Sequence, residues 1–199
     1  MSPRKYELQA RAESAAQTRE RIVAATMDLH IRKGISRTTL RDIANAADVS
    51  PGTVLRHFPQ MEELVVACGT LTQRLLPFPG PEVAARIDDP RVRLRATVRA
   101  VFGYWDAAPQ AWPMIEGERA HWAPVDQHVR DREAARRALL DAVLPPGRGR
   151  RRTRLLATAL ALTTWNSRAA LRDEGLDLDA ATEAVVDLLL PAGAGAPAR

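Results

Sequence analysis

The stretch from position 50 to position 57 has the residue types needed to contact a polyanion at the start of a short helix. Ser50 is a good N-cap residue, and Pro51 suits the first helical position, where its missing amide costs nothing. The free amides of Gly52 and Thr53 can bind a phosphate oxygen. Hydrogen bonds from Thr53 and Arg56, and apolar contact from Pro51, suit the edges of bases. The spacing therefore favours recognition of a nucleic acid.

A helix of about seven residues is not stable alone, so a neighbouring element must hold it. Apolar residues recur at helical spacing just before it, at Leu40, Ile43, Ala44 and Ala47. Thr39 and Asp42 have the spacing of a capping box at the start of that helix. In the turn, Asp48 is expected to adopt a left-handed backbone conformation, and Val49 to fill the space between the helices. Residues 38–58 therefore predict a helix-turn-helix with its second helix in the DNA major groove.

The distribution of charge supports a polyanionic partner for this segment. Residues 1–60 carry ten Lys or Arg and six Asp or Glu, so they hold +4 of the formal net charge of +5. This excess is modest. On spacing and charge alone, an ordinary αα-hairpin with a solvated polar face stays open as an alternative.

Residues 18–64 resemble, in order and spacing, the DNA-binding domain of the TetR family of bacterial transcriptional regulators. The residues that carry the resemblance are Thr18, Arg19, Ile22, Gly34, Thr38, Thr39, Asp42, Ile43, Ala44, Val49, Ser50, Pro51, Gly52, Thr53, His57, Phe58, Pro59, Glu63 and Leu64. The resemblance implies an all-α fold with an N-terminal helix-turn-helix three-helix head in residues 1–60. It also implies a C-terminal helical ligand-binding and dimerisation domain in residues 61–199, linked to the head by a helix from about residue 60.

Three positions depart from the family's usual pattern. The family usually has Gly at the position of Asp48, an aromatic residue at that of Leu55 and Lys at that of Met61, and the last two usually contact phosphate. We expect weaker DNA binding, or compensation by Arg41, Arg56 and the N-terminal arm. The residues expected to bind DNA are Thr39, Arg41, Ser50, Pro51, Gly52, Thr53, Leu55, Arg56 and His57, the last as a phosphate contact.

Length and composition bound the class of protein. A chain of 199 residues can form one or two domains with a substantial core. The single cysteine, Cys68, excludes an intrachain disulfide and a multi-cysteine zinc site, and it suits a reducing compartment. No apolar run approaches a membrane span, and the N-terminus has no signal-peptide core, so a cytoplasmic protein is expected.

Periodicity, Pro and Gly predict the remaining elements. Helices are expected over residues 14–33, 60–75, from 90 onward, 124–144, 153–173 and 179–190, with a short helix punctuated by prolines 109 and 113. Residues 1–13 are expected to form a disordered tail off DNA, or alternatively an arm that reaches the DNA backbone or minor groove. Residues 145–152 are expected to form a mobile, solvated loop, and the tail after Pro191 is expected to be disordered.

The last two predicted helices are apolar over more than one face. The apolar residues that line them are Leu155, Leu156, Ala159, Leu162 and Ala169 in the first, and Ala181, Val185, Val186, Leu188 and Leu189 in the second. These faces could be buried within one chain, or they could form a four-helix interface with a symmetry mate. The resemblance favours a homodimer, since family members usually dimerise through their last two helices, and a dimer would match a palindromic operator.

Aromatic side chains crowd into residues 102–122. The residues expected to bind an effector are Phe102, Trp105, Trp112, Met114, His121, Trp122 and Trp165. Aromatic walls with a few polar groups suit a small-molecule pocket, although aromatic stripes also form plain cores. The resemblance implies a small effector, which we expect to be mainly apolar, without indicating its identity.

The expected function is that of a ligand-responsive repressor, in which an effector shifts the helix from residue 60 and lowers operator affinity. Repression rather than activation follows from family habit alone. An effector-independent DNA-binding protein is the alternative. An enzyme built on Glu116, Glu118, His121 or Cys68 is not expected, because the sequence offers no nucleophile–base pair, phosphate loop or metal set. His121 and His128 lie seven residues apart without a completing carboxylate pair, so neither a metal nor a cofactor is expected.

Overall fold

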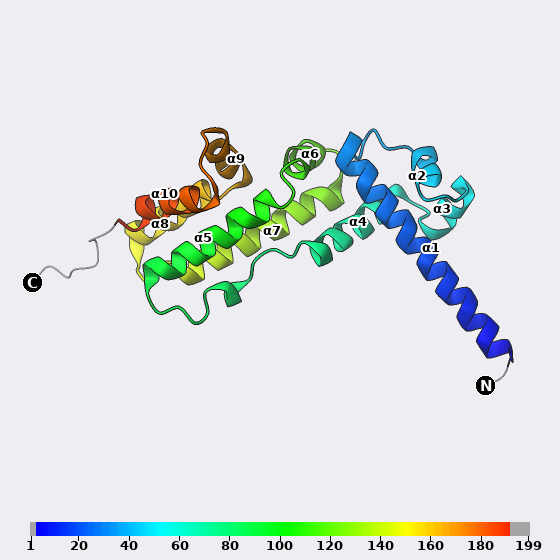
Figure 1. Ribbon diagram of the computed structural model, residues 1–199, viewed down its shortest axis with the longest axis horizontal. Coiled ribbons are helices and arrows are strands. Elements are labelled where there is room, and N and C mark those ends of the chain that lie inside the picture. Colours follow the sequence, from blue (N-terminus) through cyan, green and yellow to red (C-terminus); the bar gives the residue numbers. More distant parts are fainter. Residues whose placement is uncertain (1–2, 192–199) are drawn as a thin grey trace, which may run out of the picture. The chain divides into compact units, whose positions relative to one another are not determined.

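The computed structural model describes residues 3–191, and every regular element within them is a helix (Figure 1). In chain order these are α1 (Pro3–Lys33), α2 (Leu40–Ala46), α3 (Pro51–His57), α4 (Met61–Leu75), the 3₁₀ helix η1 (Pro81–Val83), α5 (Pro90–Asp106), α6 (Ala111–Glu118), α7 (Ala123–Val143), α8 (Gly149–Leu162), α9 (Trp165–Asp173) and α10 (Leu178–Leu189). The all-α fold expected from the sequence is confirmed. None of the helices in the described part has the length and apolar character to cross a membrane.

The chain folds into two compact units. Unit 1 contains the described part of Met1–Leu75 together with Pro113–His128, and unit 2 contains Leu76–Trp112 together with the described residues from Val129 onward. Helices α6 and α7 therefore each contribute residues to both units. The functional division near residue 60 that the sequence suggests is a different kind of boundary and stays a prediction.

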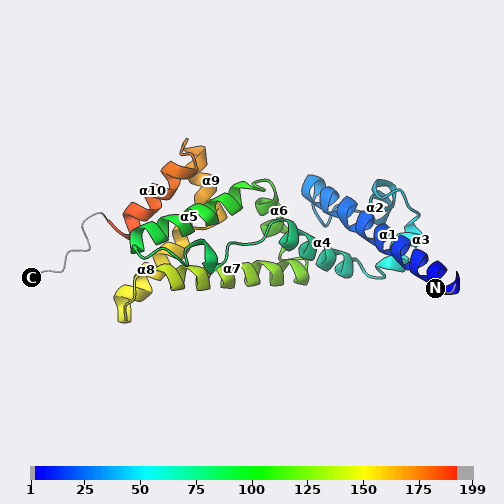
Figure 2. The same cartoon turned by 60° about the horizontal axis from the view of Figure 1, so that its bottom comes forward.

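In unit 1, α1 packs against α2 and α4, and α2 packs against α3 (Figure 2). The centre of this core is formed by Ile22, Ile43, Val54 and Leu64, each with at most 1% of its surface exposed. A second cluster of buried residues contains Ile35, Val65 and Val125. Burial of these apolar groups is the main stabilising term for the short helices α2 and α3, which are too short to be stable in isolation.

In unit 2, α10 packs along α5, and both helices contribute buried apolar residues to the core of this unit. Three ion pairs join the two helices at intervals of one turn: Arg91 with Asp187, Arg95 with Glu183, and Arg99 with Asp179. The partner number falls by four as the arginine number rises by four, as an antiparallel pair requires. These side chains are largely exposed, so the pairs contribute little stability and mainly favour one register.

Helix α1 begins eleven residues before the expected start at residue 14, so the prediction of a disordered tail over residues 3–13 is wrong for this structure. The segment contains strong helix formers and no Gly or Pro after Pro3, which lies in the first turn where proline is tolerated. Residues 8–17 are all exposed, so propensity and not packing extends the helix here. The expected disorder after Pro191 falls outside the described residues.

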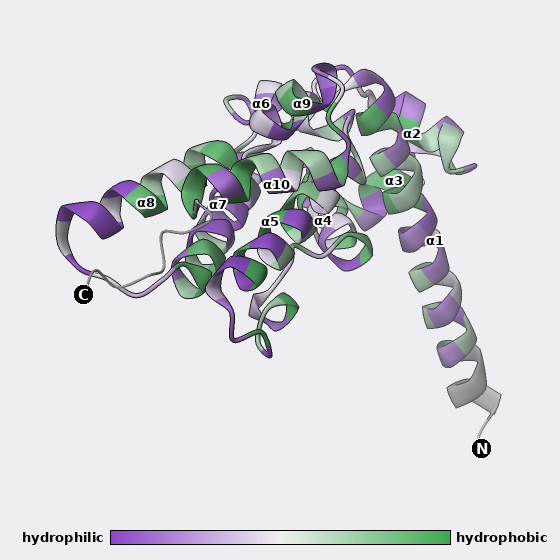
Figure 3. Cartoon of the chain, turned by 60° about the vertical axis from the view of Figure 1, so that its left-hand side comes forward, coloured by the Kyte–Doolittle hydropathy of each residue, from purple (hydrophilic) through white to green (hydrophobic). Residues whose placement is uncertain are grey.

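The single helix predicted over residues 153–173 is instead two helices. Thr164 ends the continuity, because its hydroxyl accepts a hydrogen bond from the Ser167 amide at 3.0 Å and so caps α9. Helix α8 also begins earlier than predicted, at Gly149, so the arginines at 150–152 are helical and the expected loop is restricted to a shorter segment. The hydropathy colouring shows this hydrophilic beginning of α8 and hydrophobic residues further along it (Figure 3).

Candidate functional site

Helix α3 has the N-terminus that the sequence predicts. The Ser50 hydroxyl accepts a hydrogen bond from the Thr53 amide at 3.1 Å, and Pro51 occupies the first turn. Ser50 Oγ and Thr53 Oγ1 also lie 3.0 Å apart, so one hydroxyl donates to the other. The cap therefore leaves a single hydroxyl hydrogen from this pair available to a ligand.

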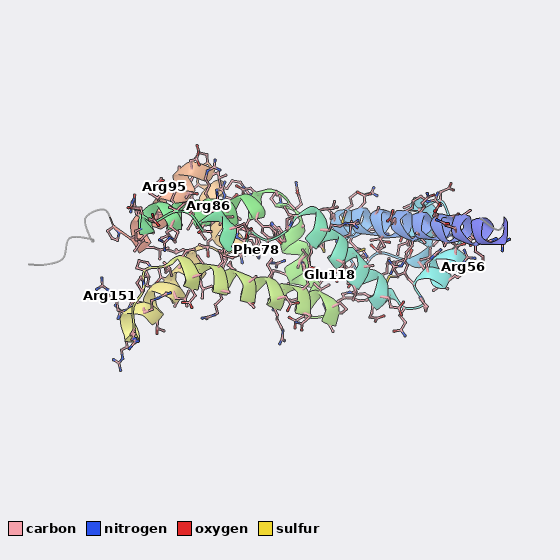
Figure 4. All side chains as sticks on the ribbon, turned by 90° about the horizontal axis from the view of Figure 1, so that it is seen from below. Arg56, Phe78, Arg86, Arg95, Glu118 and Arg151 are labelled. Atoms are coloured by element: carbon pink, nitrogen blue, oxygen red, sulfur yellow. The ribbon has the colours of Figure 1, made fainter. Side chains whose placement is uncertain are left out.

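One side of α3 is fixed in the core and the other is open. Val54 is 1% exposed and Phe58 is 2% exposed, while Pro51, Gly52 and Arg56 are all exposed. The Arg56 side chain extends away from the helix (Figure 4). The helix thus presents small and basic groups on a rigid support, which is the geometry that base contacts require.

Contacts with α1 and the backbone conformation of the turn hold α2 and α3 in place. The guanidinium carbon of Arg19, on α1, lies 4.4 Å from the centre of the Phe58 ring. Asp48 has φ of 53°, which confirms the left-handed conformation expected in the turn, and Val49 packs against the core as predicted. Gly34 has φ of 87° and ends α1 in the conformation that favours glycine.

The capping box at α2 is present and is joined to α1. Thr39 Oγ1 accepts from the Asp42 amide at 3.2 Å, and Asp42 Oδ2 accepts from the Thr39 amide at 2.8 Å. Lys33 Nζ lies 2.5 Å from the same carboxylate oxygen. The hydrogen bond from Lys33, followed by those from Thr39, holds the pKa of Asp42 well below its usual range. This carboxylate therefore stays charged and locks α2 to the end of α1.

The predicted DNA-binding residues all lie between positions 39 and 57, but they differ in how far their side chains are exposed to a ligand. Exposed members are Arg41, Ser50, Pro51, Gly52, Leu55 and Arg56, whereas Thr53 and His57 are partly buried. Thr39 is exposed, but its hydroxyl donates to Asp42 and accepts from the Asp42 amide, so it has no hydrogen left for a phosphate. Leu55 is 47% exposed, while Met61 packs against the unit 1 core. Neither of these side chains can donate a hydrogen bond to a phosphate.

Unit 1 also contains a polar cluster that sequence reasoning missed. Glu118, at the end of α6, accepts hydrogen bonds from the Ser36 amide at 3.0 Å and from the Ser36 hydroxyl. The Trp122 indole donates to the Ser36 hydroxyl at 3.1 Å. Burial acts to raise the pKa of Glu118, but the hydrogen bonds from Ser36 lower it overall. The loop between α1 and α2 is thereby tied to the α6–α7 turn. No local sequence signal links residues 82 positions apart, so this cluster could not be found from spacing.

In unit 2, part of the predicted effector site forms one aromatic cluster. The ring centres of Trp105 and Trp112 lie 5.0 Å apart with their planes at 89°, and Tyr104 lies 5.0 Å from Trp105 and 5.1 Å from Trp112. Phe78 completes the cluster at 5.0 Å from Tyr104. All of these contacts except the tilted Tyr104–Trp112 pair are edge-to-face, which is a favourable geometry for aromatic rings. The two indole N–H groups are already used by backbone carbonyls.

The other predicted effector residues are dispersed. Phe102 is buried in unit 2, where the Arg168 guanidinium lies 5.8 Å from its ring centre, and Trp165 is half-buried at the start of α9. Three more belong to unit 1: Trp122 and Met114 pack on its second cluster, and His121 is exposed beside a hollow that Met114 and Glu118 also line. The structure therefore brings Trp105 and Trp112 together, but it does not collect all seven residues around them.

Helix α7 contributes charged residues that the sequence analysis did not select. Its buried stripe runs through Val125, Val129, Arg132, Arg136 and Leu140, so two arginines occupy positions that face the core. Arg132 lies against both tryptophan rings, 5.0 Å from the centre of Trp112 and 5.4 Å from that of Trp105. The signal was present in the sequence, because arginine on the apolar stripe of a helix is unusual.

Metal chemistry has no support among residues 3–191, since no group of three or more His, Cys, Asp or Glu side chains in that range could hold an ion. The Nδ1 atom of His128 lies 3.1 Å from the Nε2 atom of Gln73, within hydrogen-bond distance. Burial raises the pKa of the Cys68 thiol to about 12, which makes it a poor nucleophile.

Comparisons with known proteins agree with this geometry. The sequence model of the family described as "Bacterial regulatory proteins, tetR family" matches residues 22–68. Over 186 residues the chain is 31% identical to the HTH-type transcriptional regulator BetI of Burkholderia thailandensis, covering 86% of this chain and 93% of BetI. It is 42% identical over 55 residues to the HTH-type transcriptional regulator TtgR of Pseudomonas putida, but this match spans only 28% of the chain and 26% of TtgR.

A solved structure extends the likeness of fold. The crystal structure of AibR, described as a complex with isovaleryl coenzyme A and operator DNA, aligns with a TM-score of 0.61. The alignment covers 87% of this chain and 98% of AibR at 16% identity, so it bears on the fold alone.

Proposed function

Because the chain belongs to the TetR family of bacterial transcriptional regulators, we propose that it binds a DNA operator through α2 and α3 and is released by a small molecule. The relatives are transcriptional regulators and not enzymes. The observation that carries the proposal is the α3 surface, where exposed Pro51, Gly52 and Arg56 lie on a helix anchored by buried Val54. Thr53 and Arg56 read base edges in the major groove, and the Gly52 amide and His57 contact phosphate. The Thr53 amide, expected from the sequence to be free for phosphate, instead donates to the Ser50 cap.

Phosphate binding in this chain has to come from residues other than Leu55 and Met61. Both replace residues that usually contact the DNA backbone in the family, and Met61 packs against the core. Arg41 is exposed on α2 and Arg56 is exposed on α3, so these two compensate, together with the beginning of α1. Each phosphate contact adds a salt-dependent share of affinity, so fewer contacts give a shallower dependence on salt.

The operator is a palindrome bound by a homodimer, and the last helices supply the interface. Much of the apolar face of α10 is already covered by the chain itself, since Ala181, Val185, Val186 and Leu189 are at most 5% exposed. Leu188 lies outside that face and is 70% exposed. Leu155 and Leu156 of α8 are partly exposed. These groups are available to a second copy of the chain, and two copies would present two α3 helices to two half-sites.

The effector is a mainly apolar small molecule that acts on the aromatic cluster of unit 2. AibR is described with isovaleryl coenzyme A and operator DNA, which shows that this fold accommodates both kinds of partner in that protein. In this chain Trp112 belongs to the aromatic cluster and its neighbour Pro113 already belongs to unit 1. Trp112 lies in the first turn of α6, and Glu118 at the other end of the same helix is bonded to Ser36 beside α2, so we expect α6 to transmit a change at Trp112. Together with α4, α6 is the coupling element, and repression in the cytoplasm is the expected outcome.

The experiment that tests DNA binding is footprinting of the DNA upstream of the gene, titrated across salt. The matched variant is Thr53→Ala combined with Arg56→Ala, whose side chains lie outside the core. Protected sequence that is lost in the double variant, while the melting temperature is unchanged, supports the proposal. Equal and purely salt-dependent binding of both proteins would overturn it for that DNA. An effector-independent binder would give the same footprint but no release by any compound.

A further inference from the structure

Among its described residues, unit 2 contains three arginines that are almost completely buried: Arg132 at 6%, Arg136 at 8% and Arg168 at 3% exposed. A buried guanidinium is costly unless acceptors replace the water that it has lost. We therefore compare the three side chains by the hydrogen-bond acceptors that surround each guanidinium.

Two of the three have acceptors. Arg168 donates to Asp106 at 2.8 Å and to the Leu176 carbonyl at 3.1 Å. Arg136 donates to the Leu160 carbonyl at 2.6 Å and to the Thr163 hydroxyl at 3.1 Å. Both are structural arginines whose hydrogen bonds join α7 or α9 to their neighbours.

Arg132 differs from both. Its Nε and Nη1 atoms are buried and have no hydrogen-bond partner among the described residues. The neighbouring groups are the rings of Trp112 and Trp105 and the hydroxyl of Tyr104, which is hydrogen-bonded to the guanidinium. Burial raises the pKa of Tyr104, so the phenol stays neutral and supplies no counter-charge. The rings stabilise the cation through their faces, but they accept no hydrogen bond in the plane of the guanidinium.

The other polar groups of the cluster are already occupied. The Trp105 indole donates to the Thr163 carbonyl at 2.9 Å, and the Trp112 indole donates to the Trp105 carbonyl at 2.7 Å. Among the N–H donors of this aromatic cluster, the unused ones are therefore those of Arg132. The free Nε–H and Nη1–H groups lie on different edges of the planar guanidinium, and each is a charge-assisted donor for which an anionic oxygen, such as one oxygen of a carboxylate, is the strongest acceptor.

We propose that Arg132 binds the carboxylate of an anionic effector whose apolar body lies against Trp105 and Trp112. This inference rests on the proposed function and specifies the chemical class of the effector. A neutral ligand would leave the Arg132 charge without a counter-ion, and a cationic ligand would be repelled by the guanidinium that already occupies the ring faces. The class that fits is an organic acid with an aromatic or aliphatic body.

A matched series of three probes tests the charge without any change to the protein. We would titrate the purified full chain with 2-naphthoate, 2-naphthamide and 2-naphthylmethylammonium, following tryptophan fluorescence and melting temperature. Octanoate serves as an anion with an aliphatic body. A hydrogen bond to a charged group predicts that 2-naphthoate binds about tenfold or more tightly than the amide. It also predicts no measurable binding of the cation. Equal affinity for acid and amide, or no response to either anion, would overturn the proposal.

A pair of variants on the same helix then assigns the anion to Arg132. Arg132→Met removes the buried charge, and Arg137→Met removes an exposed one from α7. Arg132→Met is expected to melt at or above the wild-type temperature without ligand, since a buried unpaired cation is replaced by an apolar group of similar length. It should lose the tenfold preference for the acid, while Arg137→Met keeps it. An unchanged preference in Arg132→Met would show that the carboxylate binds elsewhere.

The failure of this inference is separable from the failure of the proposed function. If the chain binds operator DNA and 2-naphthamide releases it as well as 2-naphthoate does, the anion proposal is wrong and the regulator proposal stands. If no DNA is bound specifically, the regulator proposal fails whatever the probes do.

Discussion

Lowering the pH from 7.5 to 5 should destabilise the fold through a single buried histidine, His30. The side chain is 4% exposed, and its Nε2 atom has no hydrogen-bond partner within the described part of the chain. Burial lowers the pKa of His30 from 6.5 to about 4, against the opposing influence of the nearby Glu118 carboxylate. Below pH 6.5 the unfolded chain therefore binds a proton that the folded chain refuses. Stability is complete above the unfolded-state pKa and is lost as the pH falls from 6.5 towards 4.

The size of the effect follows from the two pKa values. Between the unfolded and folded pKa values of His30, each pH unit of acidification lowers the free energy of unfolding by about 1.4 kcal/mol, and pH 5 lies roughly 1.5 units below the unfolded-state pKa. The expected loss is about 2 kcal/mol at pH 5 relative to pH 7.5. Asp42 does not contribute in this range. The pKa of its carboxylate is lowered in the folded chain, so its contribution to stability is lost only at pH values more acidic than 5.

The assay is unfolding in guanidinium chloride at both pH values, followed by circular dichroism, on wild type and His30→Leu. The variant has no titrating group at this position, so its free energy of unfolding should fall by about 2 kcal/mol less than that of wild type. Subtracting the two proteins removes the contribution of every other titrating residue. If both proteins lose the same free energy, His30 is not held neutral by burial and the reasoning is refuted.

Three further substitutions have expected outcomes in chemical denaturation. Ser50→Ala removes the N-cap of α3 and should cost about 1 kcal/mol; no loss would show that the cap is dispensable. Asp48→Gly relieves a left-handed residue and should add roughly 1 kcal/mol, whereas a loss would mean that the Asp side chain stabilises the turn. Asp106→Asn leaves the buried Arg168 without its carboxylate and should cost about 2 kcal/mol, while the exposed Asp173→Asn should stay near wild type; equal effects would refute the pairing.

The head could be predicted closely because its signals are local. The Ser50 cap, the Thr39–Asp42 capping box and the left-handed Asp48 each depend on residues within a few positions of one another. Each local preference agrees with the burial of Val54 in the core. The bounds of α2 and α3 therefore follow from the sequence to within one residue.

The rest escaped prediction either because the deciding contacts are distant in sequence or because a stronger general pattern masked a local signal. The bonds of Glu118 to Ser36 join residues that no helical period relates. The break before α9 depended on the Thr164 cap, within a segment whose apolar period favoured one continuous helix. Arg132 was passed over because its type suggests the surface, and only its position on the buried stripe of α7 shows otherwise.

Selection of DNA from a random pool by the purified full chain tests the central claim most directly. A family regulator that binds as a homodimer through α3 predicts an enriched inverted repeat whose half-site centres are about one helical turn, or a multiple of it, apart. The protein carrying Thr53→Ala and Arg56→Ala should enrich no such repeat. Enrichment of the same sequence by both proteins would contradict the assignment of α3 as the recognition helix. No enriched sequence with wild type would contradict the operator-binding function itself.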